Sequence, residues 1–320
     1  MRKSEFPVCD YDLAATLTSG QAFRWRLMGD AWEGVIRGRW VRLRQSSSPP
    51  LEGSGVGSLK SVVEAATAEP QTDWQWLTDY LRLADDHAAA LASFPDDEPL
   101  RAATKHCRGL RLLRQEPWEC LASFILSSTK QIVQIEQCVA LLCERYGEPL
   151  EPSRGAGLRP GVLQTENSNA PGQKPALQHY SFPMPARIAA ASEPELRECK
   201  MGFRAKYLLD AARRVSSGQL DLTALPGLPL HEARAALMEC HGVGRKIADC
   251  VLLFSLGFDE AFPIDVWVER ALHQLYFPKR RVKRARLERF ATTHFGPHAG
   301  LAQQYLFHYL RTGGRVKSAK

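Results

Sequence analysis

Two residues of opposite charge occupy positions from which they could act on a sugar. Lys246 lies in the first turn of a predicted helix that begins near Arg245, directly after the turn at residues 241–244. The positive end of a helix dipole disfavours an ammonium ion there, and a lysine nucleophile needs the neutral amine. Asp265 follows Phe262-Pro263-Ile264 and precedes a helix-like run, so we predict that it caps that helix.

The chain between these two residues is long enough to bring them together. A helix from Lys246 to Leu256 rises roughly 15 Å, and the connector 257–264 can reach back up to about 28 Å when extended. A carboxylate beside the amine could then stabilise positive charge on a sugar ring during glycosyl transfer. The alternative for Lys246 is an exposed lysine at a helix start, and for Asp265 a cap and nothing more.

The segment 231–257 predicts two helices joined by a glycine turn. The turn His241-Gly242-Val243-Gly244 breaks the helical pattern before a second apolar helix begins near Arg245. Glycines let the backbone approach a partner closely, and the amides of the next helix can face a phosphate. We therefore predict a helix-hairpin-helix in which Gly242, Gly244 and Arg245 lie where a phosphate of a partner can bind. An ordinary corner between two helices would also need glycine. One face of the first helix is apolar: Ala233, Ala236, Leu237 and Cys240.

Composition sets outer limits on the function. The chain has 320 residues, is 44% hydrophobic and carries a formal charge of +7, which excludes a disordered chain and fits a polyanionic partner without proving one. No apolar run is long enough to span a membrane, and the N-terminus lacks the apolar stretch of a secretory signal. We expect an intracellular protein, in the cytoplasm or nucleoid of a bacterium or in a eukaryotic nucleus.

The period of the hydrophobic pattern changes along the chain. Alternating residues predict a β-meander over 22–45, and residues 46–58 read as a loop. After about residue 73 the apolar spacing becomes helical, and helices dominate again from residue 185 to the end. This order predicts an α+β protein.

These shifts suggest where the domains begin and end. We predict a domain at 1–98 formed by an antiparallel sheet with flanking helices, and an all-α domain at 99–320. Residues 150–178 are rich in Pro, Gly, Ser and Asn and are predicted to be a flexible insert.

Several motifs in the right order resemble the 8-oxoguanine DNA glycosylase family, within the helix-hairpin-helix glycosylase superfamily. GVGRKIADC followed by FPIDVW resembles the superfamily signature around Lys246 and Asp265. Further similar segments are SGQAFRW (19–25), GLRLLRQEPWECLASFILSS (109–128), GFRAKYL (202–208) and FGPHAGLAQQYLF (295–307).

The resemblance implies both a fold and a reaction. The fold would be an N-terminal antiparallel sheet domain similar to the TATA-binding protein, followed by an all-α helix-hairpin-helix glycosylase domain. The enzyme would be a monomer that flips 8-oxoguanine out of double-stranded DNA and excises it through a lysine Schiff base. It would then cleave the strand by β-elimination, as a bifunctional glycosylase and abasic-site lyase.

The resemblance also assigns roles to the residues that match its motifs. Lys246 would attack C1′ of the sugar, and Asp265 would support the charge that develops there. The carbonyl of Gly20 would accept a hydrogen bond from the N7–H that oxidised guanine has, because N7 of guanine itself is an acceptor.

Other matching positions would hold the flipped base and the DNA. Gln303 would read the Watson–Crick edge of the base, while Cys250 and Phe307 would sandwich its ring. Phe203 would fill the vacated stack, and Arg204 would contact the orphaned partner base. Taken singly, each of these residues could instead be ordinary core or surface.

The chain departs from better-studied members at three DNA-contact positions. Thr129 and Gln134 replace an asparagine and an arginine that read the opposite cytosine, and Trp267 replaces a histidine near the phosphate. We therefore expect weaker discrimination for cytosine opposite the lesion than in arginine-bearing members.

No cofactor is expected to be required. An iron–sulfur cluster of the kind found in related glycosylases needs four cysteines after the catalytic aspartate, and no cysteine follows Cys250. In this superfamily the hairpin carbonyls can hold a monovalent or calcium ion, here those of Met238, Cys240 and Val243.

Two other functions compete with this interpretation. A relative that excises alkylated bases typically uses aspartate and water and lacks the hairpin lysine, so Lys246 argues against it. A non-catalytic DNA-binding module would need the hairpin but not the coincidence of Lys246, Asp265 and a base pocket. Partners other than DNA, including a membrane, are not expected.

Overall fold

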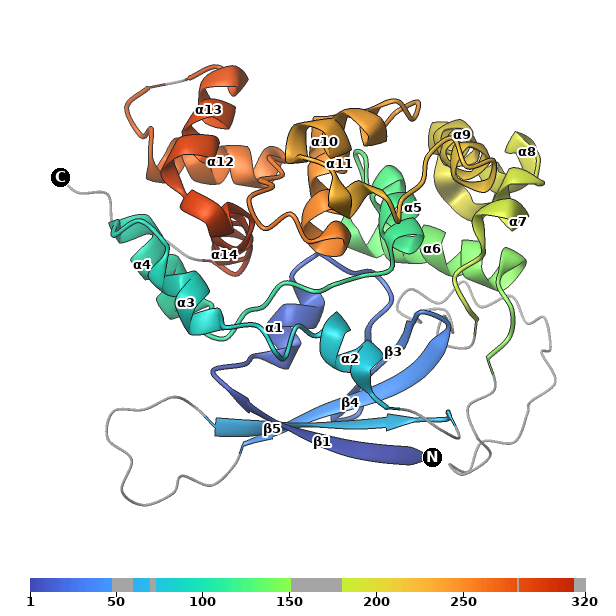
Figure 1. The fold of residues 1–320 in the computed structure, drawn as a ribbon, viewed down its shortest axis with the longest axis horizontal. Coiled ribbons are helices and arrows are strands. Elements are labelled where there is room, and N and C mark those ends of the chain that lie inside the picture. Colours follow the sequence, from blue (N-terminus) through green and yellow to red (C-terminus); the bar gives the residue numbers. More distant parts are fainter. Residues whose placement is uncertain (48–59, 70–72, 151–179, 281, 314–320) are drawn as a thin grey trace.

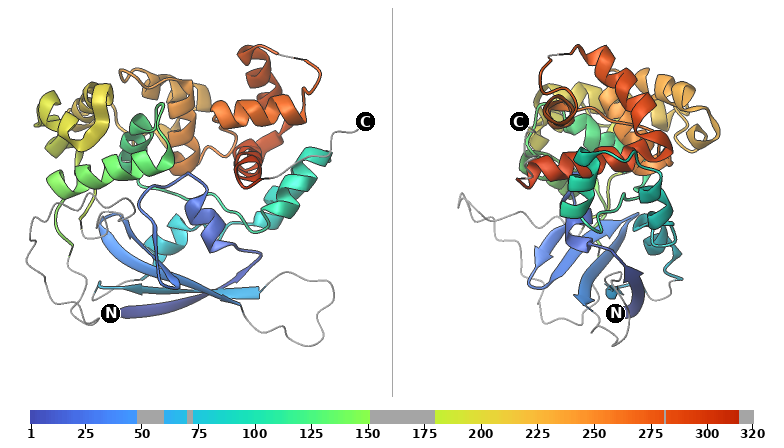
Figure 2. Two further views of the ribbon diagram at one scale, coloured as in Figure 1. Left: turned by 180° about the vertical axis from the view of Figure 1, so that it is seen from behind. Right: turned by 90° about the vertical axis from the view of Figure 1, so that its left-hand side faces the viewer.

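The protein has two layers, a β-sheet and a larger group of helices above it (Figure 1). The computed structural model describes residues 1–47, 60–69, 73–150, 180–280 and 282–313. Figure 2 shows the same separation from behind and from the side. Most of the predicted loop 46–58 and of the predicted insert 150–178 lies outside the described residues, although the insert's flanking residues Pro149 and Tyr180 pair with each other.

A five-stranded antiparallel sheet forms the first layer, in the order β1-β5-β4-β3-β2. The predicted meander is confirmed, but its first strand is shorter than expected because Trp25 leaves the sheet to pack against Gly34, where a Cβ would lie 2.6 Å from the Trp25 ring. The two strands β1 and β5 were not predicted. The strands are β1 (Arg2–Cys9), β2 (Arg26–Met28), β3 (Ala31–Ile36), β4 (Arg39–Ser47) and β5 (Lys60–Thr67).

Most of the remaining described elements are helices. They are α1 (Leu13–Thr18), α2 (Gln75–Tyr80), α3 (His87–Ala92), α4 (Glu98–His106), α5 (Pro117–Leu126), α6 (Ile132–Tyr146), α7 (Pro185–Ala189), α8 (Glu193–Leu196), α9 (Ala205–Ser216), α10 (Leu230–Met238), α11 (Arg245–Val251), α12 (Val266–Leu275), α13 (Arg284–His294) and α14 (Ala299–Arg311). Helices α1 and α2 lie next to the sheet and the others form the upper layer, with Ala90 of α3 part of the helical core (Figure 1).

Helix α5 is the centre of the helical layer. Its N-cap Glu116 accepts hydrogen bonds from two backbone amides, and Pro117 occupies the first helical position, where a missing N–H costs nothing. From Trp118 to Leu126 every side chain except Glu119 is buried. Helices α6, α9 and α11 all pack against it. The end of α5 is therefore a fixed point in the helical core.

Two hydrophobic cores meet along the extended segment that precedes α5. Leu113 belongs to the core between the sheet and helices α1 and α2, whereas Leu110 and Leu112 belong to the helical core. Neighbouring side chains of an extended strand point to opposite sides, so one short segment contributes to both cores. The domain boundary at residue 98 stays a prediction.

Candidate active site

The predicted helix-hairpin-helix is present as α10, a tight turn and α11. Gly242 has φ +83°, and a Cβ there would lie 2.4 Å from the Tyr207 ring, so only glycine fits. The amide of Val243 donates to the carbonyl of Cys240 at 3.0 Å, which closes the turn. Helix α11 then starts at Arg245 after the extended residue Gly244.

Lys246 is held at the end of the central helix. Its Nζ donates a hydrogen bond to Oγ of Ser127 at 3.3 Å, and Ser127 is the C-cap of α5. The same Nζ lies 5.1 Å from the centroid of the Phe124 ring, one turn earlier on α5. The amine is thus directed by a hydroxyl and an aromatic face, without a carboxylate partner within ion-pair distance in the described chain.

Asp265 caps α12, as predicted. Its Oδ1 accepts hydrogen bonds from the amides of Trp267 at 2.9 Å and Val268 at 2.8 Å. Helix α11 ends in a π-helical turn and at Gly257, after which the connector returns the chain to α12. Asp265 and Lys246 line the same pocket, so the connector does bring them together.

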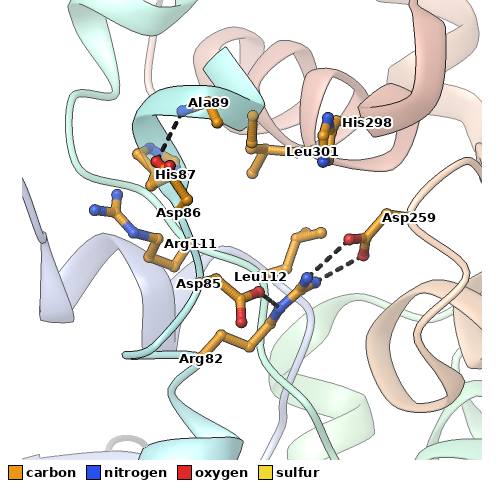
Figure 3. Close-up of a pocket in the computed structure, with 11 residues that line it drawn as sticks. Arg82, Asp85, Asp86, His87, Ala89, Arg111, Leu112, Asp259, His298 and Leu301 are labelled. Atoms are coloured by element: carbon orange, nitrogen blue, oxygen red, sulfur yellow. Dashed lines mark hydrogen bonds and ion pairs between the residues drawn. The ribbon is translucent and has the colours of Figure 1, made fainter. Parts of the chain in front are cut away.

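An ion pair from the sheet layer fixes the connector. Arg82 donates two hydrogen bonds to the carboxylate of Asp259, both 2.8 Å long, and Asp259 lies in the connector between α11 and α12 (Figure 3). Arg82 also pairs with Asp85 at the edge of a cavity of about 380 Å³. A bidentate arginine–carboxylate pair restrains both distance and orientation, so it helps to place Asp265. No pattern in the sequence predicted this pair.

All six residues predicted for the reaction and for the base line one pocket. Its cavity of about 50 Å³ is room for only about four water molecules. A purine base does not fit without some movement of the walls. The six predicted residues are Gly20, Lys246, Cys250, Asp265, Gln303 and Phe307.

The loop that carries Gly20 is fixed by two buried glutamines. Gly20 has φ +79°, and its neighbour Ser19 accepts a hydrogen bond through its carbonyl from Nε2 of Gln304 at 3.0 Å. Gln21 is fully buried and bonds to the carbonyl of Thr16 at 2.9 Å and to that of Arg111 at 2.8 Å. Neither glutamine was predicted from the sequence to support this loop. The signal for Gln304 was its place beside Gln303 in the mostly apolar first half of α14.

Gln303 presents an unused acceptor to this pocket. The side chain is 4% exposed, and its Oε1 has no hydrogen-bond partner among the described residues. An unsatisfied buried acceptor costs about 1–3 kcal/mol, which a donor on a ligand would recover. Burial raises the pKa of the Cys250 thiol to about 12, so this wall of the pocket is neutral. Phe307, half-buried, forms another wall.

Two predicted DNA-contact residues lie just before α9. Phe203 is 48% exposed and packs edge-on against Tyr207, with ring centroids 5.9 Å apart. Arg204 is 6% exposed, and its guanidinium donates to the carbonyl of Ser128 and to the hydroxyl of Thr129. Arg204 therefore supports the loop after α5 in the unbound protein, and a contact with a DNA base would require these bonds to change.

The remaining predicted contacts lie on the surface. Gln134 is exposed, and its Oε1 accepts from the amide of Gln131 at 3.1 Å as part of the start of α6. Trp267 is 38% exposed. Arg245 pairs with Asp249 at 3.6 Å and with Glu288 at 3.7 Å.

The described residues contain no group of three or more His, Cys, Asp or Glu side chains placed to hold a metal ion. The carbonyl of Cys240 accepts one hydrogen bond within the hairpin and keeps a second lone pair that an ion could use. Within the described chain no helix has both the length and the apolar character needed to cross a membrane.

Two family models together match residues 4–295 of the chain. Residues 4–121 match the family model of the 8-oxoguanine DNA glycosylase N-terminal domain. Residues 122–295, more than half of the chain, match the model of the HhH-GPD superfamily base excision DNA repair proteins. A probable N-glycosylase/DNA lyase from Methanothermobacter thermautotrophicus is 28% identical over 96% of both chains.

Solved structures share the whole architecture. The structure of MBOgg1 in complex with a low-affinity DNA ligand has a TM-score of 0.80 and 32% identity, and covers 98% of this chain and 100% of that one. The 8-oxoguanine glycosylase/lyase of Clostridium acetobutylicum, in complex with double-stranded DNA containing cytosine opposite 8-oxoguanine, has a TM-score of 0.78 and 27% identity, and covers 98% and 99%.

A sheet domain joined to a helix-hairpin-helix domain, with a lysine and an aspartate in one pocket, defines the class of helix-hairpin-helix DNA glycosylases. Within that class, this chain belongs to the 8-oxoguanine DNA glycosylase family of the HhH-GPD superfamily.

Proposed function

We propose that this protein flips 8-oxoguanine out of duplex DNA, excises it and then cleaves the strand, with Lys246 as the nucleophile. One observation carries the assignment of residues. Lys246 and Asp265 line the same pocket as the unpartnered amide oxygen of Gln303. Amine, carboxylate and a base-reading acceptor are thus in one place.

The neutral amine of Lys246 attacks C1′ of the flipped nucleotide. The C1′–N9 bond breaks, its electron pair leaves with the base, and the sugar ring opens to a Schiff base between C1′ and Nζ. The carboxylate of Asp265 stabilises the positive charge at C1′ as that bond breaks. Loss of a proton from C2′ then expels the phosphate at C3′, which nicks the strand by β-elimination.

The pocket identifies the damaged base by hydrogen bonds. The carbonyl of Gly20 accepts from N7–H of 8-oxoguanine, whereas N7 of guanine is an acceptor and would oppose that carbonyl. Gln303 accepts from the Watson–Crick edge, and Cys250 and Phe307 enclose the ring. An unmatched polar pair in a buried pocket is costly, so one proton can decide the choice.

The surrounding surface holds the DNA. Phe203 fills the space that the flipped base vacates, next to Arg204. The hairpin residues Gly242, Gly244 and Arg245 face a phosphate. The carbonyls of Met238, Cys240 and Val243 would hold a monovalent or calcium ion at the same turn. Thr129 and Gln134 face the opposite base, with Trp267 near the backbone.

Borohydride trapping on a duplex containing 8-oxoguanine tests the proposal. A covalent adduct is expected with the natural protein and none with Lys246→Gln. Base release without an adduct would instead support a water-based mechanism of the kind expected for alkylated bases. No base release from any lesion would support a non-catalytic DNA-binding module.

A further inference from the structure

Two arginines beside the pocket are each stacked on an aromatic side chain of the site. The guanidinium of Arg311 lies over the Phe307 ring at 5.2 Å, and that of Arg270 lies over the Trp267 ring at 4.9 Å. Phe307 lines the pocket, and Trp267 donates its amide to Asp265. Helices α12 and α14, which carry the two arginines, pack against each other.

Neither arginine forms an ion pair with a carboxylate within the described chain, in contrast to its neighbours. Arg284 pairs with Glu269 at 3.1 Å and with Glu288 at 3.2 Å, and Arg245 also reaches Glu288. Arg270 and Arg311 have no such bridge, although both are exposed. Glu269 and Glu288 are thus used by other cations.

Helix stability does not explain Arg270. It lies in the second turn of α12, outside the C-terminal turn in which the helix dipole favours a cation. Trp267, whose ring lies under Arg270, is 38% exposed, and the adjacent Val266 is 75% exposed. This end of α12 therefore presents apolar and cationic groups to solvent.

Arg311 is close to two residues proposed to hold the base. A Cβ on Gly20 would lie 3.2 Å from Nη1 of Arg311 and 3.3 Å from Cε1 of Phe307. Burial lowers the pKa of Arg311, and the negative charge of Asp265 opposes that shift. A partly desolvated guanidinium at the rim of the pocket, with no carboxylate bridge, is suited to an anion that arrives with the substrate.

Stacking leaves the donors of a guanidinium free. Neither guanidinium donates a hydrogen bond to another described residue, so its N–H groups are available to bind two oxygens of one phosphate. We propose that Arg270 and Arg311 bind two phosphates that flank the flipped nucleotide, one arginine to each, and so hold its sugar between Lys246 and Asp265. This inference rests on the proposed function.

The first measurement is the affinity for a duplex containing a tetrahydrofuran abasic-site analogue, over a series of salt concentrations. Arg270→Gln and Arg311→Gln are each expected to weaken binding about tenfold at low salt and to reduce the salt slope by about 1. Arg187→Gln removes the same charge from α7, at the far end of the helical layer (Figure 1), and is expected to change neither quantity. Arg270→Lys and Arg311→Lys keep the charge but lose the planar fork, so they should recover the salt slope but only part of the affinity.

The second measurement replaces single phosphates of the duplex by neutral methylphosphonates. At the phosphate that an arginine binds, the replacement should weaken binding to the natural protein about tenfold and should have no further effect in the matching arginine variant. The two arginines should match two different phosphates. Equal methylphosphonate effects in the natural protein and in both variants would overturn the proposal.

Trapping separates this inference from the proposed function. At saturating protein, both glutamine variants should still form the borohydride adduct, because Lys246 is intact. If the natural protein forms no adduct with 8-oxoguanine DNA, the proposed function fails. If the adduct forms but the phosphate effects do not match, only the proposed phosphate binding by Arg270 and Arg311 fails.

Discussion

The side chain of Lys246 donates its hydrogen bond to Ser127 at 3.3 Å, so the proposed nucleophile of α11 is directed by the C-cap of the central helix α5. Because α5 is buried along almost its whole length, Ser127 is a rigid support. The bond ties the position of the amine to the helical core rather than to the hairpin alone.

Removing that support should slow the chemistry without preventing it. In Ser127→Ala the amine loses one hydrogen bond, worth about 0.5–1.5 kcal/mol, and samples other rotamers. We expect the single-turnover rate of adduct formation to fall about tenfold at saturating enzyme. Ser217→Ala, at the exposed end of α9, is the matched control and should leave the rate unchanged. An unchanged rate in Ser127→Ala would show that Ser127 does not direct the amine.

Asp265 serves both as a cap and as the proposed charge stabiliser, and two substitutions separate these roles. Asn caps a helix about as well as Asp, so Asp265→Asn should keep the free energy of unfolding while the excision rate falls about a hundredfold or more. Asp265→Ala should lose the activity and about 1 kcal/mol of stability as well. Chemical denaturation and single-turnover excision measure the two effects. Normal excision by Asp265→Asn would contradict the catalytic role.

The sequence was sufficient to predict the elements around the chemistry but not the contacts that support them. The hairpin, the cap at Asp265 and the two-layer class follow from glycine spacing, capping chemistry and the change of hydrophobic period. The strands β1 and β5 were missed. The inward positions of β5 are Ser61, Val63, Ala65 and Thr67, so hydroxyl and small side chains weaken its alternation.

The supporting contacts could not be predicted because they join distant parts of the chain. Gln304 reaches the carbonyl of Ser19 across 285 positions, and Arg82 reaches Asp259 across 177. A local pattern carries no information about such pairs. Gln303 and Phe307 were found only because a family resemblance supplied them. Arg204, which was predicted to contact the orphaned base, is buried against Ser128 and Thr129, and its contact with DNA stays a prediction.

The support of Gly20 gives a test of base recognition. Gln304→Leu leaves the buried carbonyl of Ser19 without its donor, at a cost of about 1–3 kcal/mol in stability. The looser loop should also lower the preference for 8-oxoguanine over guanine, measured as the ratio of binding constants for the two duplexes with Lys246→Gln as the common background. Gln137→Leu, on the exposed face of α6, should change neither. A loss of stability with no change in the ratio of binding constants would show that Gln304 supports folding but not base recognition.

Opposite-base choice should be weak in this protein. Gln134 accepts from the amide of Gln131 at the start of its own helix, and the hydroxyl of Thr129 accepts from Arg204, so both side chains are held within the protein. Neither offers the opposite cytosine the planar donor fork of an arginine. Excision rates should therefore differ little among duplexes with C, A, G or T opposite the lesion. Gln134→Arg should raise the preference for C roughly tenfold or more, because a bidentate contact is worth about 1–3 kcal/mol of discrimination. A strong preference for C in the natural protein would exclude this account.

His87 makes stability depend on pH. Its Nε2 lies 3.1 Å from the Tyr305 hydroxyl of α14, beside the cavity in Figure 3. Burial, helped by the positive charge of Arg111, lowers the pKa of His87 from 6.5 to about 3. Below pH 6.5 the unfolded chain binds a proton that the folded protein does not, so the contribution present above that pH is lost as the pH falls.

The free energy of unfolding should accordingly decrease by up to about 1.4 kcal/mol per pH unit below pH 6.5 through this group alone. Urea denaturation at pH 7, 6 and 5 measures the slope. His87→Asn has no titrating ring and should show a smaller decrease over the same range, whereas His231→Asn, whose side chain is 78% exposed, should follow the natural protein. Identical slopes for the natural protein and His87→Asn would mean that the buried imidazole is protonated in the folded state as readily as in the unfolded one.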